Sequence, residues 1–230
     1  MARTSAKGRG VAQALLIVAV ASPVLVLLSA LGVRAGLLSL ETGWSLLTLQ
    51  VAWWLAWAGS AAALVAVVLA LKDLRRLGLF ALVAVLIAGA ALAGFVWQKG
   101  RLAAGPVEHV STDLEEIPGF GDLRDQRRGP GPGPAIGAEV CPGAQPVMRQ
   151  VAPQTAGWAL EQAGFRVRGF GVQRADGTRT GYWFGVTHDA VIRIRPGRTD
   201  IRVAARDGLP HGGEACRLAT RISAALRTGE

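Results

Sequence analysis

Arginines recur at alternate positions in the C-terminal half of the chain. Five of them lie next to an apolar residue or between two: Arg166, Arg168, Arg193, Arg195 and Arg202. Successive side chains of a strand point to opposite faces, so this alternation predicts one face of a sheet that carries guanidinium groups. Such a face could bind an anionic lipid or another anionic envelope polymer. The alternative is an ordinary solvated face that Asp176, Asp189 and Asp200 neutralise locally, and the sequence leaves both open.

The chain has two cysteines, Cys141 and Cys216, both in the same half. An oxidising compartment favours a disulfide between them, which would be worth on the order of 4 kcal/mol in the chain-entropy description. The alternative is a catalytic thiolate with His211 as its base, five residues before Cys216. Gly212 and Gly213 leave that geometry undetermined, so the disulfide is the prediction.

Other polar side chains could support hydrolytic or transfer chemistry: Asp113, His188, Asp189 and His211. An enzyme built on them requires all four in one pocket. The three histidines lack metal-ligand spacing, and the sequence contains no nucleophile elbow, phosphate-binding loop or dinucleotide fingerprint. We therefore predict no metal, no cofactor and no catalytic residue.

Three uncharged apolar runs occupy the N-terminal half, at residues 10–33, 42–71 and 77–98. About 20 apolar residues in a helix cross a hydrocarbon core of about 30 Å, so each run is long enough. We predict transmembrane helices at about 11–33, 49–71 and 77–97, within an anchor of residues 1–105. A cleaved signal peptide is the alternative for the first run, which is too long for a typical one.

The composition of these runs indicates an anchor. They contain no Asp, Glu, Lys, Arg or His, whereas an ion or proton pathway normally needs one. Small residues at Gly59, and in the pairs Gly89/Ala93 and Ala90/Gly94, would allow helices to approach closely.

Basic residues near the ends of the runs predict the orientation. They cluster before the first run and between the second and third: Arg3, Lys7, Arg9, Lys72, Arg75 and Arg76. Both clusters belong on the cytoplasmic side, so three spans carry residues 107–230 across the membrane. We expect a bacterial inner-membrane protein with a cytoplasmic N-terminus and a periplasmic C-terminal domain.

The formal charge of +9 is divided unevenly along the chain. Up to Gly105 there are nine Lys/Arg and two Asp/Glu, whereas from Pro106 onward there are 16 and 14. Most of the excess thus belongs to the predicted membrane half. The nearly neutral C-terminal half argues against a nucleic-acid partner.

The C-terminal half has the pattern of an α+β domain. We predict helices at 154–163 and 214–226, and strands at 165–174, 179–187, 190–195 and 200–205. Ala175–Gly177 reads as the turn between the first two strands. The order helix, four strands, helix favours an antiparallel meander covered on one face by helices. The Gly/Pro-rich segment 124–137 predicts an extended, mobile loop within the domain.

An ordered series of short motifs runs through this half. It comprises Glu108–Asp113 followed by Ile117–Phe120, then Cys141–Pro146, Phe184–Pro196, Asp200–Arg202 with Arg206, and Arg221-Ile222. In order and composition the series resembles the DUF1499 family, a domain of unknown function found in bacterial envelope proteins and plastids. The resemblance covers about residues 107–227 and brings no established activity.

The sequence departs from the family pattern at several polar positions. Cys141 stands where members often have Tyr, Gly143 replaces Asp, and Ala204-Ala205 replace serines. If those polar residues carry chemistry in relatives, this chain lacks them. The appearance of Cys141 in a chain that also has Cys216 implies a variant of the family with a disulfide.

Together these features predict a membrane-anchored envelope protein in the lipid bilayer. Its C-terminal domain is expected to bind a partner protein or an anionic lipid or polymer. The competing hypothesis is an envelope hydrolase or transferase with a degenerate active site. A scaffold that recruits partners through its membrane helices is a third possibility.

Overall fold

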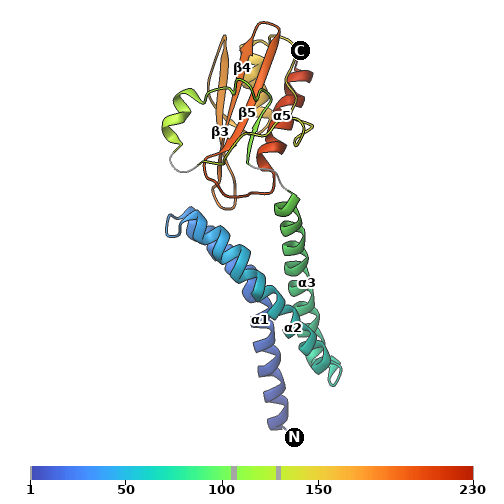
Figure 1. Ribbon diagram of the computed structural model, residues 1–230. Coiled ribbons are helices and arrows are strands. Elements are labelled where there is room, and N and C mark those ends of the chain that lie inside the picture. Colours follow the sequence, from blue (N-terminus) through green and yellow to red (C-terminus); the bar gives the residue numbers. More distant parts are fainter. Residues whose placement is uncertain (1, 105–107, 128–130, 230) are drawn as a thin grey trace. The chain divides into compact units, whose positions relative to one another are not determined.

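The computed structural model describes residues 2–104, 108–127 and 131–229, and within helix α1 the side chains from residue 10 onward. The chain divides into two units, Met1–Lys99 and Gly100–Glu230. Long helices make up the first unit, and a sheet flanked by helices makes up the second (Figure 1).

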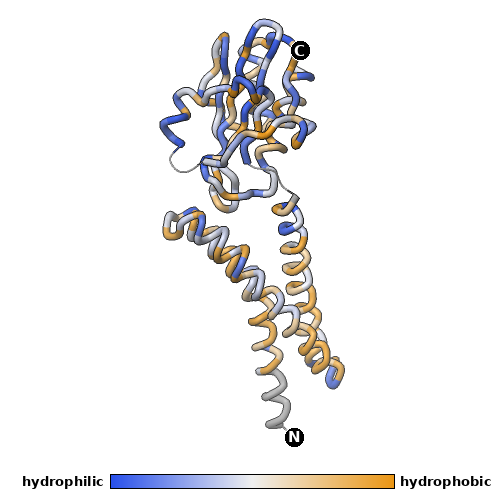
Figure 2. Tube along the Cα trace, viewed as in Figure 1, coloured by the Kyte–Doolittle hydropathy of each residue, from blue (hydrophilic) through white to orange (hydrophobic). Residues whose placement is uncertain are grey.

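Three long helical segments form the N-terminal half. They are α1 (Ala2–Arg34), the π-helix η1 (Glu41–Val51) that continues as α2 (Ala52–Ala70), and α3 (Leu74–Ala104). Their apolar parts, Gly10–Arg34, Glu41–Ala70 and Leu74–Ala103, are long and apolar enough to cross a membrane, which indicates a membrane protein. Figure 2 shows that hydrophobic residues predominate along these helices, with hydrophilic residues interspersed among them. The second helix begins at Glu41, earlier than the predicted residue 49, because backbone hydrogen bonding continues through the more polar residues before Leu49.

Polar groups in these apolar helices are bonded to the backbone. Ser22 donates to the carbonyl of Ala52 at 2.7 Å, and Thr48 donates to that of Gly43 at 2.8 Å. In a membrane-spanning helix, such bonds satisfy polar groups that would otherwise be unpaired in hydrocarbon.

Helices α1 and α2 pack closely at Gly59. A Cβ at this position would lie 3.1 Å from the Cα of Ala19, so the small residue permits the contact, as predicted. At Gly89 and Gly94 a Cβ would meet nothing within 4 Å. The prediction of close helix contacts therefore does not hold at these two positions.

The C-terminal unit contains a five-stranded antiparallel sheet in the order β1-β5-β4-β3-β2. The strands are β1 (His109–Ser111), β2 (Arg166–Gly171), β3 (Arg174–Thr180), β4 (Thr187–Arg195) and β5 (Arg198–Ala205). The helices are the 3₁₀ helix η2 (Gly121–Gln126), α4 (Pro153–Gln162) and α5 (Glu214–Thr228). The predicted helices at 154–163 and 214–226 are thus confirmed to within two residues at each end.

The prediction of four strands was wrong, because it lacked β1. This strand is only three residues long, too short to show an alternating pattern. It exists because its backbone pairs with β5, with His109 opposite Ala204 and Ser111 opposite Arg202.

The predicted turn at Ala175–Gly177 was also wrong, since these residues lie inside β3. Gly177 pairs with Val167 on one side and Ala190 on the other, and the chain turns instead at Val172–Gln173. A Cβ at Gly177 would lie 3.0 Å from the carbonyl oxygen of Arg166. The glycine therefore permits a close approach of two strands, which is the other use of glycine in a sheet.

The main core lies between one face of the sheet and helices α4 and α5. Alternate residues of β4 and β5, such as Ile192 and Ile201, are fully buried against Leu160, Leu218 and Ile222 of the helices. The predicted alternation of apolar and arginine residues is therefore confirmed for these two central strands. We call the opposite side of the sheet the outer face.

The Gly/Pro-rich segment 124–137 is held at both ends. Residues 128–130 of this segment lie outside the described part of the chain. Residues 124–126 belong to η2, and Ile136 exchanges backbone hydrogen bonds of 2.9 Å with His109 and Ser111. Ile136 of this segment thus forms an isolated β-bridge with Val110 of β1.

Cys141 and Cys216 have their sulfur atoms 2.00 Å apart, at disulfide distance, and their Cα atoms 5.8 Å apart. The pair joins the segment before α4 to the first turns of α5 across 75 residues. The alternative of a free thiolate beside His211 is therefore not seen.

We predict that reduction of this disulfide lowers the free energy of unfolding of the C-terminal domain by about 4 kcal/mol, because the reduced unfolded chain gains loop entropy. Urea unfolding of the full chain in micelles, followed by pulse proteolysis of the domain, measures the change. A double variant Cys141→Ala, Cys216→Ala serves as the control and is expected to be insensitive to reductant. Equal midpoints for the oxidised and reduced protein would contradict the prediction.

Candidate functional site

The outer face of the sheet is partly covered by the segment that follows β1. Phe120 and Leu123 pack there against Val191 of β4 and Ala204 of β5, and all four are buried. The prediction of an open arginine face is therefore wrong for this part of the sheet, because a second small apolar core covers it. Among the residues that the structure describes, two hollows lie beside this second core, and Gly119 lines both of them.

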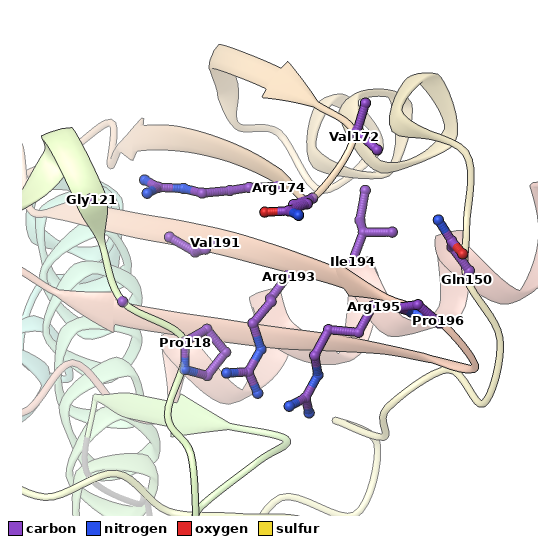
Figure 3. Close-up of a pocket in the computed structure, with 12 residues that line it drawn as sticks. Pro118, Gly121, Gln150, Val172, Arg174, Val191, Arg193, Ile194, Arg195 and Pro196 are labelled. Carbon is purple, nitrogen blue, oxygen red and sulfur yellow. The ribbon is translucent and has the colours of Figure 1, made fainter.

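The first hollow has a volume of about 740 Å³ and contains two of the predicted arginines (Figure 3). We call it the Arg193 hollow, lined by Pro118, Gln150, Arg174, Arg193, Arg195 and Pro196, among others. Arg193 and Arg195 project from β4 on the same side, as the alternation predicted (Figure 3).

Carboxylates balance the charge of the Arg193 hollow. Four lie within ion-pair distance of its three arginines: Asp113, Glu116, Asp176 and Asp200. Arg193 donates to Asp113 at 2.7 Å, and Arg195 donates to the fully buried Asp200 at 2.7 Å. The backbone N–H of Glu116 and then the guanidinium groups of Arg195 and Arg193 hold the pKa of Asp113 below its usual value, against the opposing effect of burial. These arginines already have counter-ions, so this hollow resembles a structural ion-pair network.

Two other predicted binding residues, Arg166 and Arg168, lie on the edge strand β2. Both are exposed, and neither lines either of these two hollows. The structure therefore does not gather the five predicted arginines into one site.

The second hollow has a volume of about 610 Å³ and surrounds Arg202. We call it the Arg202 hollow, lined by His109, Phe120, Arg124, Arg127, Arg202 and Arg206 together with Gly119 and residues 131–133. Of its four arginines, sequence reasoning selected only Arg202. Of the other three, Arg124 lies in η2, Arg127 follows η2 and Arg206 follows β5, and no alternating pattern marks these positions.

Arg202 is half-buried and has only neutral partners among the described residues. Its Nε donates to Nε2 of His109 at 3.0 Å, and its Nη1 donates to the carbonyl of Pro118 at 2.7 Å. The guanidinium also lies 3.9 Å from the ring centroid of Phe120. Burial, followed by the positive charge of Arg127, lowers the pKa of Arg202 to about 10. The side chain is thus charged at neutral pH without a counter-ion.

His109 orients Arg202 through a neutral imidazole. Nδ1 lies 2.9 Å from the carbonyl oxygen of Gly133, which can only accept, so Nδ1 carries the hydrogen and Nε2 is free to accept from Arg202. Burial lowers the pKa of His109, the bond to Gly133 raises it by less, and the charges of Arg202 and Arg127 lower it further. The histidine therefore adds no positive charge and aligns the guanidinium.

Arg127 and Arg206 share the buried carboxylate of Asp189. Arg127 donates to it at 2.8 Å, and Arg206 donates at 2.9 and 3.0 Å. Within the part of the chain that the structure describes, Asp189 is the one carboxylate that forms an ion pair with any arginine of this hollow. The four arginines of the Arg202 hollow are therefore balanced by one paired carboxylate among the described residues, that of Asp189.

The four predicted catalytic side chains do not converge. His188 and Asp189 are neighbours on β4, so they point to opposite faces of the sheet, and Asp113 belongs to the Arg193 hollow. Only His188 and His211 come together, with ring centroids 6.0 Å apart. No group of three or more His, Cys, Asp or Glu side chains in the described residues could hold a metal ion.

A carboxylate that sequence reasoning did not select lies beside this histidine pair. Glu108 is 2% exposed, and its Oε2 lies 3.4 Å from Nε2 of His188. It accepts backbone N–H groups at the start of α5, from His211, Gly213, Glu214 and Ala215, at 2.7–3.2 Å. Burial alone would raise the pKa of Glu108, but His188 and the N–H of Ala215 lower it more, so the net shift is downward. Glu108 is a helix cap supplied from more than 100 residues away, and no local sequence signal marks it.

No family model, curated protein or solved structure matches the chain. The resemblance to the DUF1499 family therefore stays a prediction from the residues.

We predict that Glu108→Gln destabilises the C-terminal domain by about 3 kcal/mol at neutral pH, because it removes the charge that the start of α5 requires. The folded pKa of Glu108 lies below its ordinary value of 4.5, so the carboxylate stabilises the fold above that pH and loses this effect as the pH falls through the folded pKa. The stability difference between variant and wild type is therefore expected to shrink in acid.

Urea unfolding of the full chain in micelles at several pH values measures this difference. Glu115→Gln, which changes an exposed carboxylate in the same part of the chain, is the matched control and is expected to have little effect. A Glu108→Gln effect that stayed constant from neutral pH into acid would contradict the role of the charge.

Proposed function

We propose that the chain is a membrane-anchored protein whose C-terminal domain binds an anionic envelope component in the Arg202 hollow. Three apolar helices support the anchor, and they contain no ionisable side chain between residues 10 and 33, 42 and 71, or 77 and 98. We place the protein in a bacterial inner membrane, with the domain on the periplasmic side, on the strength of its basic clusters.

The unbalanced charge of the Arg202 hollow carries the proposal. A half-buried guanidinium without a counter-ion costs free energy, because desolvation is not repaid by a nearby negative charge. The lowered pKa of Arg202 reflects the same cost. An anion bound between Arg202, Arg124 and Arg206 would supply the missing charge. In the Arg193 hollow, by contrast, an anion would have to compete with carboxylates already in place.

Phosphate-bearing lipids or polymers fit the chemistry of the hollow best. The 16 basic residues from Pro106 onward are all arginine, and the planar guanidinium fork matches phosphate oxygens in pairs. The volume of about 610 Å³ is large enough for a headgroup. An acidic segment of a partner protein is the alternative ligand. The competing hydrolase hypothesis gains no support, because its four side chains lie on different faces.

We predict that Arg202→Gln weakens phosphate-ester binding at least about tenfold, as expected for loss of a charge-assisted hydrogen bond worth about 1.5–3 kcal/mol. Glycerol phosphate, titrated calorimetrically into the full chain in nanodiscs of neutral lipid, is the probe. Circular dichroism checks that the variant is folded.

Arg166→Gln is the matched control for this experiment, because it removes the same type of side chain from the exposed edge strand. Its binding is expected to equal that of the wild type. Absence of binding by the wild type, or equal losses in both variants, would contradict the proposed site. Binding of glycerol phosphate that is displaced by an acidic peptide at lower concentration would favour a protein ligand.

We further predict that a reporter active only in the periplasm gives a signal when fused after Glu230. The same reporter inserted in the basic loop at residues 72–76 is expected to be silent, because that loop is placed in the cytoplasm. Signals in the reverse pattern, with both fusions expressed, would overturn the orientation.

A further inference from the structure

The loop between β3 and β4 presents two large aromatic side chains to the surface. Tyr182 is 80% exposed and Trp183 is 60% exposed. Their rings contact each other edge to face, with centroids 5.5 Å apart and an angle of 86°. Together they form an apolar tip with a phenol hydroxyl and an indole N–H at its rim. Neither hollow of the outer face contains these residues.

The aromatic tip lies at the end of the sheet where the chain enters the domain. The register places Thr180 opposite Thr187, next to His188 opposite Ala205. The backbone N–H of Ala205 donates to the carbonyl of Glu108 at 2.8 Å, so the first described residue after the third apolar helix lies at this end. In Figure 1 the C-terminus lies at the opposite end of the domain.

Covalent reach keeps this end of the sheet near the end of the third apolar helix. The segment that could cross a membrane ends at Ala103, and five peptide units join it to Glu108, which span at most about 18 Å. Arg101 Nη2 also lies 3.4 Å from the carbonyl oxygen of Gly212, in the loop that leads to α5. Both residues belong to the C-terminal unit. If α3 crosses a bilayer, the entry end of the sheet must therefore lie close to its surface.

We propose that Tyr182 and Trp183 insert into the headgroup interface of the bilayer and hold this end of the domain on the membrane. This inference rests on the proposed membrane location. Tyr and Trp favour the interface because their rings leave water while their polar tips stay hydrated. A partner protein is the other occupant that exposed aromatic residues fit. The reach of the chain favours the bilayer, which is always present at that distance, whereas a partner protein must be recruited.

Site-specific fluorescence in the full chain tests the proposal. An environment-sensitive dye is attached through Trp183→Cys in nanodiscs that contain spin-labelled lipids, without reductant, so that Cys141 and Cys216 stay paired. A blue-shifted emission and loss of intensity by lipid quenching are expected, because the dye sits among headgroups.

Met148→Cys is the matched control for a dye on the domain surface. Met148 is 73% exposed, and the neighbouring Val147 pairs with Thr199, at the far end of the sheet. A dye there is expected to emit as in water and to escape quenching. Equal spectra for the two positions, with both dyes unquenched, would overturn the proposal.

A third labelled position separates failure of this inference from failure of the membrane location. Leu86 lies in α3 and is 61% exposed, so a dye at Leu86→Cys reports on the bilayer core. Quenching at residue 86 without quenching at 183 would discard the aromatic contact and keep the membrane anchor. Absence of quenching at both would overturn the anchor and the inference together.

Discussion

A carboxylate buried in a protein must be neutralised or hydrogen-bonded, and this requirement organises the C-terminal domain. Glu108, Asp189 and Asp200 are each at most 2% exposed. Glu108 joins the start of the domain to α5. Asp189 of β4 forms ion pairs with Arg127, which follows η2, and with Arg206, which follows β5. Asp200 of β5 forms an ion pair with Arg195 of β4. Ion pairs and charge-assisted hydrogen bonds of buried carboxylates thus connect segments that are distant in the sequence.

The same requirement separates arginines that pair with buried carboxylates from those that have no carboxylate partner. Where carboxylates are plentiful, as around Arg193 and Arg195, each guanidinium is engaged with the protein itself. Where they are scarce, as around Arg202, the guanidinium is held by a neutral histidine, a carbonyl and an aromatic ring. An arginine-rich surface is therefore not one binding site. The local ratio of buried carboxylates to guanidinium groups decides which part of it can receive an anion.

The two units of the chain differ in their polar side chains. Polar side chains of the apolar helices such as Ser22 and Thr48 are bonded to backbone carbonyls, and the runs 10–33, 42–71 and 77–98 contain no ionisable side chain. The C-terminal domain has a second small core, a stapling cysteine pair and buried ion pairs, but its histidines and acidic residues are dispersed over both faces of the sheet. This arrangement is consistent with the proposed binding role, because catalysis requires convergent side chains whereas binding an anion requires a charged hollow.

Features that depend only on neighbouring residues could be predicted from the sequence. The three apolar helices, the helices α4 and α5, and the alternation of Ile and Arg in β4 all follow from local periodicity. Tertiary structure decided the added strand β1, the use of Gly177 in a close strand contact, and the role of Glu108. It also decided that Arg202 lacks a carboxylate partner while Arg193 has one. The contact of Gly177 joins strands 11 residues apart, whereas the other outcomes join segments about 80 to 110 residues apart. Topology and burial set these pairings, and no local pattern records them.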